Sequence, residues 1–151
     1  MAYSTAAEVV EGIKEQMLND ILGDEYIEDP EERKKRLLPL AEDAVADADA
    51  EINGYLSKRY AIPILPVPKI LNKFSVDIAI YNLVSRRGID ESDREKTVLT
   101  RYQAAIKFLL AVAEGKIGLG ISEESVQDAA ATGFQAKSSP RLFSRESMRG
   151  W

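Results

Sequence analysis

The sequence predicts an all-α protein, a compact bundle of four to five helices followed by an extended C-terminal tail. Apolar residues recur every three to four positions over long stretches before residue 115, which is the spacing of one face of a helix. Capping boxes and prolines stand where helices would begin, whereas residues 122–151 show no sustained period. We therefore divide the chain into a helical domain, residues 1–115, and a glycine-punctuated linker with a docking tail, residues 116–151.

The first helix is predicted by a capping box, Thr5-Ala6-Ala7-Glu8, in which hydroxyl and carboxylate satisfy two unpaired backbone amides. We expect this helix to end near Gly23. Its apolar side comprises Val9, Ile13, Met17, Leu18 and Ile21. Asp29-Pro30 then supplies an N-cap with proline in the first turn, so a second helix should begin there.

The second helical region opens with alternating charges and continues with a long apolar stripe. Residues 31–36 pair acids with bases at a spacing of four, which is typical of a solvated helix face rather than a nucleic-acid site. Pro39 predicts a kink or a new helix start. From Leu40 to Tyr60 the apolar stripe consists of Ala41, Ala44, Val45, Ala48, Ile52, Tyr55 and Leu56, with Asp43, Asp47 and Glu51 opposite.

Three prolines between Ile62 and Pro68 exclude a helix and favour an extended connector. Pro68 can open a third long helix that runs to about Arg87-Gly88 and is apolar around most of its circumference. Such a helix normally lies at the centre of a bundle. A second capping box, Ser92-Asp93-Arg94-Glu95, predicts a last helix to about Gly115.

Composition excludes most enzyme chemistry. The 151 residues contain no Cys and no His, so disulfides, thiolate nucleophiles, Ser-His-Asp catalysis and the usual zinc and haem ligands are excluded. Asp47 to Glu51 resembles the start of a calcium loop, but Ile52 and Lys58 occupy the positions that require glycine and glutamate. We expect no metal, no cofactor and no catalytic site. We also expect no signal peptide and no membrane association.

Asp77 is the one carboxylate on an otherwise apolar helix face. A buried carboxylate needs a partner, and Arg59 or Tyr60 is the hypothesised one. We interpret this group as structural, since no second catalytic group stands at a suitable spacing.

Charge is unevenly distributed along the chain. Residues 1–60 carry a net charge of −8, residues 61–133 are neutral, and residues 134–151 carry +3, for a total of −5. The basic tail is interleaved with apolar side chains and cannot bury itself, which indicates that it docks on a partner. The candidate partner-binding residues are Phe134, Arg141, Leu142, Phe143, Arg145, Arg149 and Trp151.

Four segments in order resemble a known family. They are Ala44 to Tyr60, with its A-x-x-D-A-x-x-E-I-x-x-Y-L…R-Y pattern; Pro66 to Leu83; Arg101 to Gly120; and Pro140 to Trp151, with its R-x-F-[ST]-R…G-[FW] ending. Together they resemble the head–tail connector proteins of tailed phages, specifically the Mu-like neck proteins.

The resemblance implies a virion protein of the neck, made in the host cytoplasm, that forms a homo-oligomeric ring, expected to be twelve-fold, beneath the portal protein. DNA would pass through the lumen without specific binding, and the acidic N-terminal half suits such a channel because it repels phosphate. Two alternatives remain open: a tail-side head-completion or stopper component of the same neck, and a small helical regulator that binds a host factor.

Overall fold

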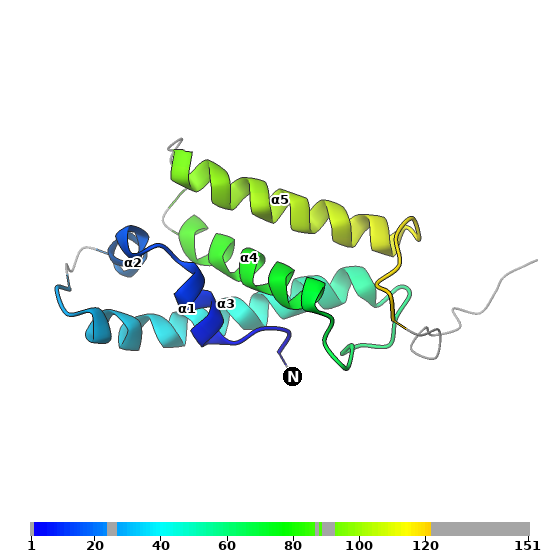
Figure 1. The fold of residues 1–151 in the computed structure, drawn as a ribbon, viewed down its shortest axis with the longest axis horizontal. Helices are drawn as coiled ribbons and strands as arrows, with labels where there is room; N and C mark the ends of the chain where they lie inside the picture. Colours follow the sequence, from blue (N-terminus) through cyan, green and yellow to red (C-terminus); the bar gives the residue numbers. More distant parts are fainter. Residues whose placement is uncertain (1, 24–26, 87, 89–92, 122–151) are drawn as a thin grey trace, which may run out of the picture.

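The computed structural model describes residues 2–23, 27–86, 88 and 93–121, and within them the chain forms five α-helices and no β-strand (Figure 1). The helices are α1 (Ala6–Gly12), α2 (Glu15–Leu22), α3 (Pro30–Leu56), α4 (Lys69–Ser85) and α5 (Asp93–Ala113). The predicted all-α class is confirmed.

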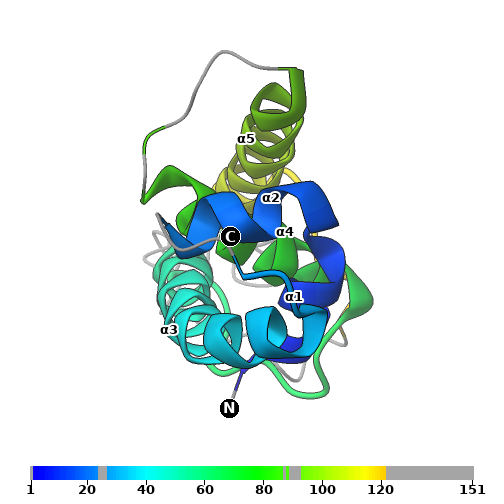
Figure 2. The ribbon, with the colours of Figure 1, turned by 90° about the vertical axis from the view of Figure 1, so that its left-hand side faces the viewer.

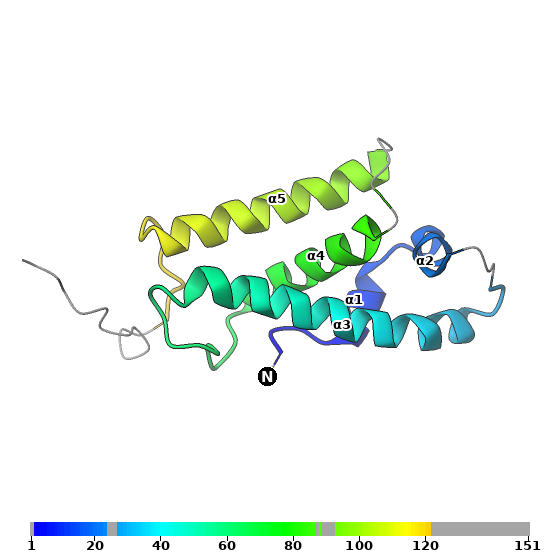
Figure 3. The ribbon, with the colours of Figure 1, turned by 180° about the vertical axis from the view of Figure 1, so that it is seen from behind.

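The three long helices form the body of the molecule, and α4 lies between α3 and α5 (Figures 1 and 3). Helix α1 packs against α3 and α4, and α2 packs against α3. Seen along its length, the molecule has α5 at one side, α3 at the other and α4 in the middle (Figure 2). The largest fully buried apolar side chains are Leu37, Ile52, Leu56, Ile64, Leu71, Ile78, Leu83 and Leu109. The central position of α4 confirms the interpretation of its nearly all-round apolar surface.

The predicted first helix is divided in two. The Thr5 capping box is present, but α1 ends at Gly12, where Ile13 adopts an extended conformation, and α2 begins after Lys14. Glycine is a weak helix former, and a Cβ at Gly12 would come within 3.0 Å of Ile80 Cδ1. The close approach of α4 and the low helix propensity of glycine both favour a break here, and Ile13 is still buried.

Helix α3 begins as predicted and continues through Pro39. Asp29 caps it by accepting a hydrogen bond from the Glu31 amide at 3.1 Å, with Pro30 in the first turn. Pro39 neither ends the helix nor starts a new one. It lies on the exposed face, where water can satisfy the carbonyl that a proline leaves unpaired.

The connector between α3 and α4 contains no helix, as predicted, and α4 follows directly after Pro68. Ser92 of the second capping box lies outside the described residues. Among the helices described, none is long and apolar enough to cross a membrane.

Candidate assembly surfaces

The N-terminal strap, residues 2–5, is fixed to the bundle by a buried polar network. The backbone amide of Tyr3 donates to both carboxylate oxygens of Asp49 on α3, at 3.1 and 3.3 Å. Ser75 on α4 donates to the same carboxylate at 3.2 Å, and its hydroxyl also pairs with that of Ser4 at 2.7 Å. The network therefore ties the strap to two long helices at once.

The Tyr3 side chain extends this network to the connector. Its hydroxyl donates to Asn53 Oδ1 at 2.6 Å and accepts from the Ile64 amide at 3.2 Å. The Tyr3 carbonyl accepts from the Asn72 side chain at 3.0 Å. Both ends of Tyr3 are therefore satisfied although the residue is only 3% exposed.

The pKa of the Asp49 carboxyl is raised despite these hydrogen bonds. Burial raises the pKa of its carboxyl, whereas hydrogen bonds from Tyr3 and Ser75 lower it; burial dominates. The Tyr3 amide and the Ser75 hydroxyl, which donate the three hydrogen bonds, oppose this rise in the pKa.

Asp77 is buried, as the sequence suggests, but the structure corrects its hypothesised partners. Burial raises the pKa of Asp77, and the positive charges that oppose this rise are Arg101 and Lys73. No hydrogen bond reaches this carboxylate from the part of the chain that the structure describes. It lines a small pocket of about 70 Å³ with Lys14, Thr97 and Arg101 among its neighbours.

Arg59 and Tyr60 serve a different junction. Arg59 donates to the Val112 carbonyl at 2.9 Å, and the Tyr60 hydroxyl accepts from the Leu119 amide at 3.3 Å. The two bonds join the segment just after α3 to the last turn of α5 and to the segment that follows α5. The antiparallel packing of α4 and α5 brings Arg101, rather than Arg59 or Tyr60, to Asp77.

Tyr102 attaches helix α5 to both α3 and α4. Tyr102 donates to Glu51 Oε1 at 3.1 Å, and its ring stacks on Tyr81 with centroids 3.9 Å apart. Burial and the Glu51 carboxylate raise the pKa of Tyr102 to about 12. The hydroxyl is thus a donor throughout the physiological range.

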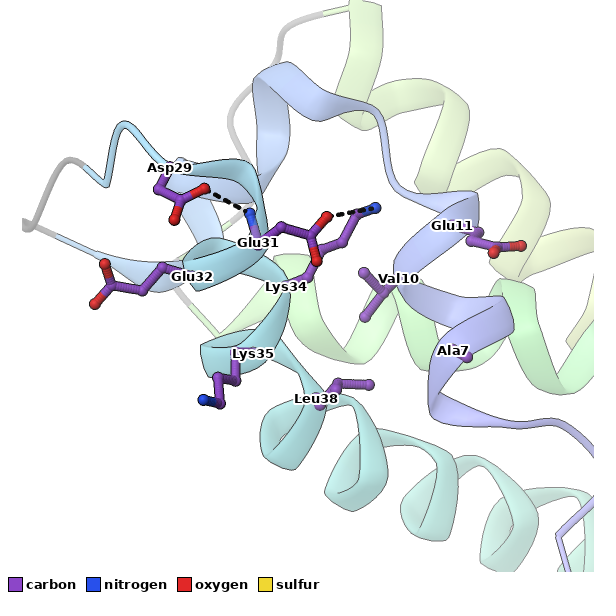
Figure 4. Close-up of a pocket in the computed structure, with 9 residues that line it drawn as sticks. All are labelled: Ala7, Val10, Glu11, Asp29, Glu31, Glu32, Lys34, Lys35 and Leu38. Carbon is purple, nitrogen blue, oxygen red and sulfur yellow. Dashed lines mark hydrogen bonds and ion pairs between the residues drawn. The ribbon is translucent and has the colours of Figure 1, made fainter.

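A broad groove of about 760 Å³ lies between α1 and the first turns of α3 (Figure 4). Val10 and Leu38 lie between the two helices, and the charged ends of Glu32 and Lys35 point away from α1 (Figure 4). Lys34 pairs with Glu31 at 4.0 Å, and Arg36 pairs with Glu32 at 3.4 Å. The charged run is therefore a solvated helix face, although Arg33 within it is buried against Glu15.

A second feature of the surface is a set of exposed apolar side chains near the connector. Ile62 and Leu65 of the connector are 43% and 51% exposed. Leu110 and Ile117, 46% and 41% exposed, belong to the end of α5 and the segment after it. The connector and residues 114–121 lie at the same end of the bundle (Figures 1 and 3). Residues 122–151 follow directly from this end.

The seven candidate anchor residues of the tail, Phe134, Arg141, Leu142, Phe143, Arg145, Arg149 and Trp151, lie outside the described residues, so their expected role stays a prediction. The proposed domain boundary lies at residue 115, and packing against the core continues beyond it, at Leu119 and Ile121. Within the described ranges, no group of three or more acidic side chains is placed to hold a metal ion.

The Asp49 network was missed at the level of sequence, although a signal was present. Asp49 follows Val45 by four positions and precedes Ile52 by three, so it lies on the apolar stripe. A carboxylate on a buried stripe demands donors. Those donors, Tyr3 and Ser75, are 46 and 26 residues away and could not be identified without the fold.

The structure thus defines a small helical-bundle protein whose described surface offers broad grooves and exposed apolar side chains. The bacteriophage Mu Gp36 family model matches residues 3–138. The Mu-like prophage FluMu protein gp36 of Haemophilus influenzae is 30% identical over 110 residues, which cover 73% of this chain and 74% of the relative. Gene product J of Escherichia phage Mu is 30% identical over 108 residues, covering 71% and 72%. The chain belongs to the phage Mu Gp36 family.

The family match also bears on the tail. It includes Phe134 but ends at residue 138, before Arg141. The proposed anchors from Arg141 to Trp151 therefore rest on the motif resemblance alone.

Proposed function

We propose that this phage protein is a structural component of the virion neck, a head–tail adaptor that forms a ring under the portal protein and extends the DNA channel. The family match over residues 3–138 carries the proposal. Its surface is consistent with protein–protein assembly, because the groove of about 760 Å³ between α1 and α3 is broad enough for protein side chains from a partner.

Charge supports the proposed channel. Residues 1–60 hold 15 acidic and 7 basic side chains, and many of these acids, such as Glu8, Glu11 and Glu28, are exposed. A wall of this sign repels phosphate, so DNA would slide past it rather than bind.

Attachment to the portal is assigned to the tail. Arg141 and Arg145 would supply charge-assisted hydrogen bonds, and Phe143 and Trp151 would supply buried apolar area. The segment before the tail, residues 114–121, lies at the end where Ile62, Leu65 and Ile117 are exposed (Figure 1), and this apolar end adds to the docking surface in the proposal.

The test compares the full-length chain with a chain truncated after Thr132, each mixed with purified portal rings of the same phage. Full-length protein should co-migrate with the portal, and the truncated protein should not, since it lacks the anchors. If neither chain binds, the portal assignment is rejected and the tail-side or regulatory role takes its place. If both bind equally, the tail is not the anchor.

A further inference from the structure

The outer face of α3 carries a row of small residues that its own chain does not explain. Ala46, Ala50 and Gly54 are all exposed, and their spacing of four places them on one stripe. A Cβ at Gly54 would meet nothing within 4 Å. Gly54 lies in the last turn of α3, and its missing side chain leaves room for a second helix to pack closely on this face.

This face is also hollowed and acidic. Ala46 and Ala50 form part of the wall of a groove of about 620 Å³ beside the N-terminal strap. The exposed carboxylates of Glu42, Asp43 and Asp47 flank the stripe. None of them forms an ion pair with any residue that the structure describes, although Arg86 lines the same small pocket as Asp43 and Asp47.

The outer face of α5 has the opposite charge. Lys96, Thr100, Gln103 and Lys107 are exposed, and their spacing of four, three and four places them on one stripe. From Lys96 to Lys107 the stripe consists of two lysines and two neutral polar residues. Its charge and its ridge of polar side chains complement the acidic stripe of small residues on α3.

The two faces cannot meet within one chain. Helices α3 and α5 touch through other residues, such as Glu51 and Tyr102, whereas both stripes are exposed in the single chain, so neither stripe covers the other. A helix that packs on either face must therefore come from another molecule, and a second copy of this chain offers the complementary face.

We propose that the outer face of α3 in one copy packs against the outer face of α5 in the next. Such a head-to-tail contact uses two different patches, and it closes into a ring when the rotation between copies is right. This inference rests on the proposed ring and names the surfaces that build it.

Cross-linking tests the contact directly, because the chain has no native cysteine. The variant carrying Ala50→Cys and Gln103→Cys is treated with a short bis-maleimide, both in concentrated solution and bound to portal rings. It should give a ladder of multimers, whereas each single variant should stay monomeric. A matched control carries Ala50→Cys with Lys14→Cys, which moves the second thiol to another exposed site. Dimers from Ala50→Cys alone would overturn the proposal, since they require a symmetric contact between two α3 faces.

Charge exchange provides a second, independent test. The variant Asp43→Lys with Asp47→Lys places lysines opposite lysines, and Lys96→Glu with Lys107→Glu places acids opposite acids. Each variant alone should assemble at least about tenfold more weakly than wild type, and an equimolar mixture should recover assembly, because opposite charges then alternate around the ring. Glu28→Lys and Lys69→Glu are the matched exposed controls and should assemble normally.

Failure of the contact and failure of the proposed function give different results. If wild type binds portal rings but neither the ladder nor the charge rescue appears, the α3–α5 contact is rejected and the adaptor role stands. If wild type does not bind portal rings, the adaptor role fails, and a ladder in concentrated solution then supports the contact by itself. Absence of both rejects both.

Discussion

Asp49 and Asp77 are two buried carboxylates with different surroundings. They are 9% and 8% exposed, and burial raises the pKa of each. Asp49 accepts three hydrogen bonds and connects the N-terminal strap to α3 and α4. Asp77 accepts none from the described residues and has only the longer-range charges of Arg101 and Lys73. Burial alone therefore does not make a carboxylate a structural centre; the donors around it do.

The largest effect is expected from Asp49→Ala. The change removes the buried acceptor of the Tyr3 amide and leaves Ser75 with only its contact to Ser4, so the free energy of unfolding should fall by about 3 kcal/mol. Chemical denaturation measures the loss. Asp47→Ala, two positions away on the exposed face of the same helix, is the matched control and should change stability by less than about 0.5 kcal/mol. Equal effects of the two changes would show that the network does not hold the strap.

A smaller loss is expected from Tyr3→Phe. This change keeps the buried ring but removes the hydroxyl that bridges Asn53 and Ile64, at a cost of roughly 1.5 kcal/mol. Tyr81→Phe is the control, because the Tyr81 ring stacks on Tyr102 and its hydroxyl forms no hydrogen bond within the described part of the chain. Thermal melts of both variants separate the hydroxyl's contribution from that of the ring.

The smallest effect, and the one that depends on pH, is expected from Asp77→Asn. A raised pKa in the fold means that the protonated form is favoured: the stability linked to Asp77 is fully present below the unfolded pKa near 3.8 and is lost as pH rises through the folded value. The variant lacks this loss. Its stability relative to wild type should therefore be higher at pH 7 than at pH 3.5.

Melts at the two pH values provide the check on Asp77. A variant that is several kcal/mol less stable than wild type at pH 7 would show that Asp77 has a tight ionic partner after all. The contrast between Asp49, which is held by close donors, and Asp77, which is not, would then be wrong.

Local patterns predicted more of this fold than long-range ones. The Thr5 and Asp29 caps, the connector after Tyr60 and the buried α4 all follow from residues within a few positions of each other. The break at Gly12 required the approach of Ile80, which is 68 positions away. The prediction of a new helix start at Pro39 was wrong because the free-energy cost of a proline within a helix depends on its exposure. Only the packing of α3 shows that Pro39 is exposed.

The assembly surfaces divide in the same way. The acidic excess of residues 1–60 and the small residues of α3 are both visible in the sequence, and the phosphate-repelling role of the acidic residues stays a prediction. The sequence does not show whether Ala46, Ala50 and Gly54 are exposed, because small residues at this spacing could equally face a neighbouring helix of the same bundle. The fold shows all three exposed, with Ala46 and Ala50 in the wall of a groove beside the N-terminal strap.

The most direct test of the adaptor role is the number of chains bound to one portal ring, measured by native mass spectrometry of wild-type protein at saturating concentration. The account predicts a discrete complex whose added mass corresponds to a complete ring, twelve copies by the family resemblance. A portal ring whose mass is unchanged, or one that binds a variable number of chains with no preferred stoichiometry, would contradict it.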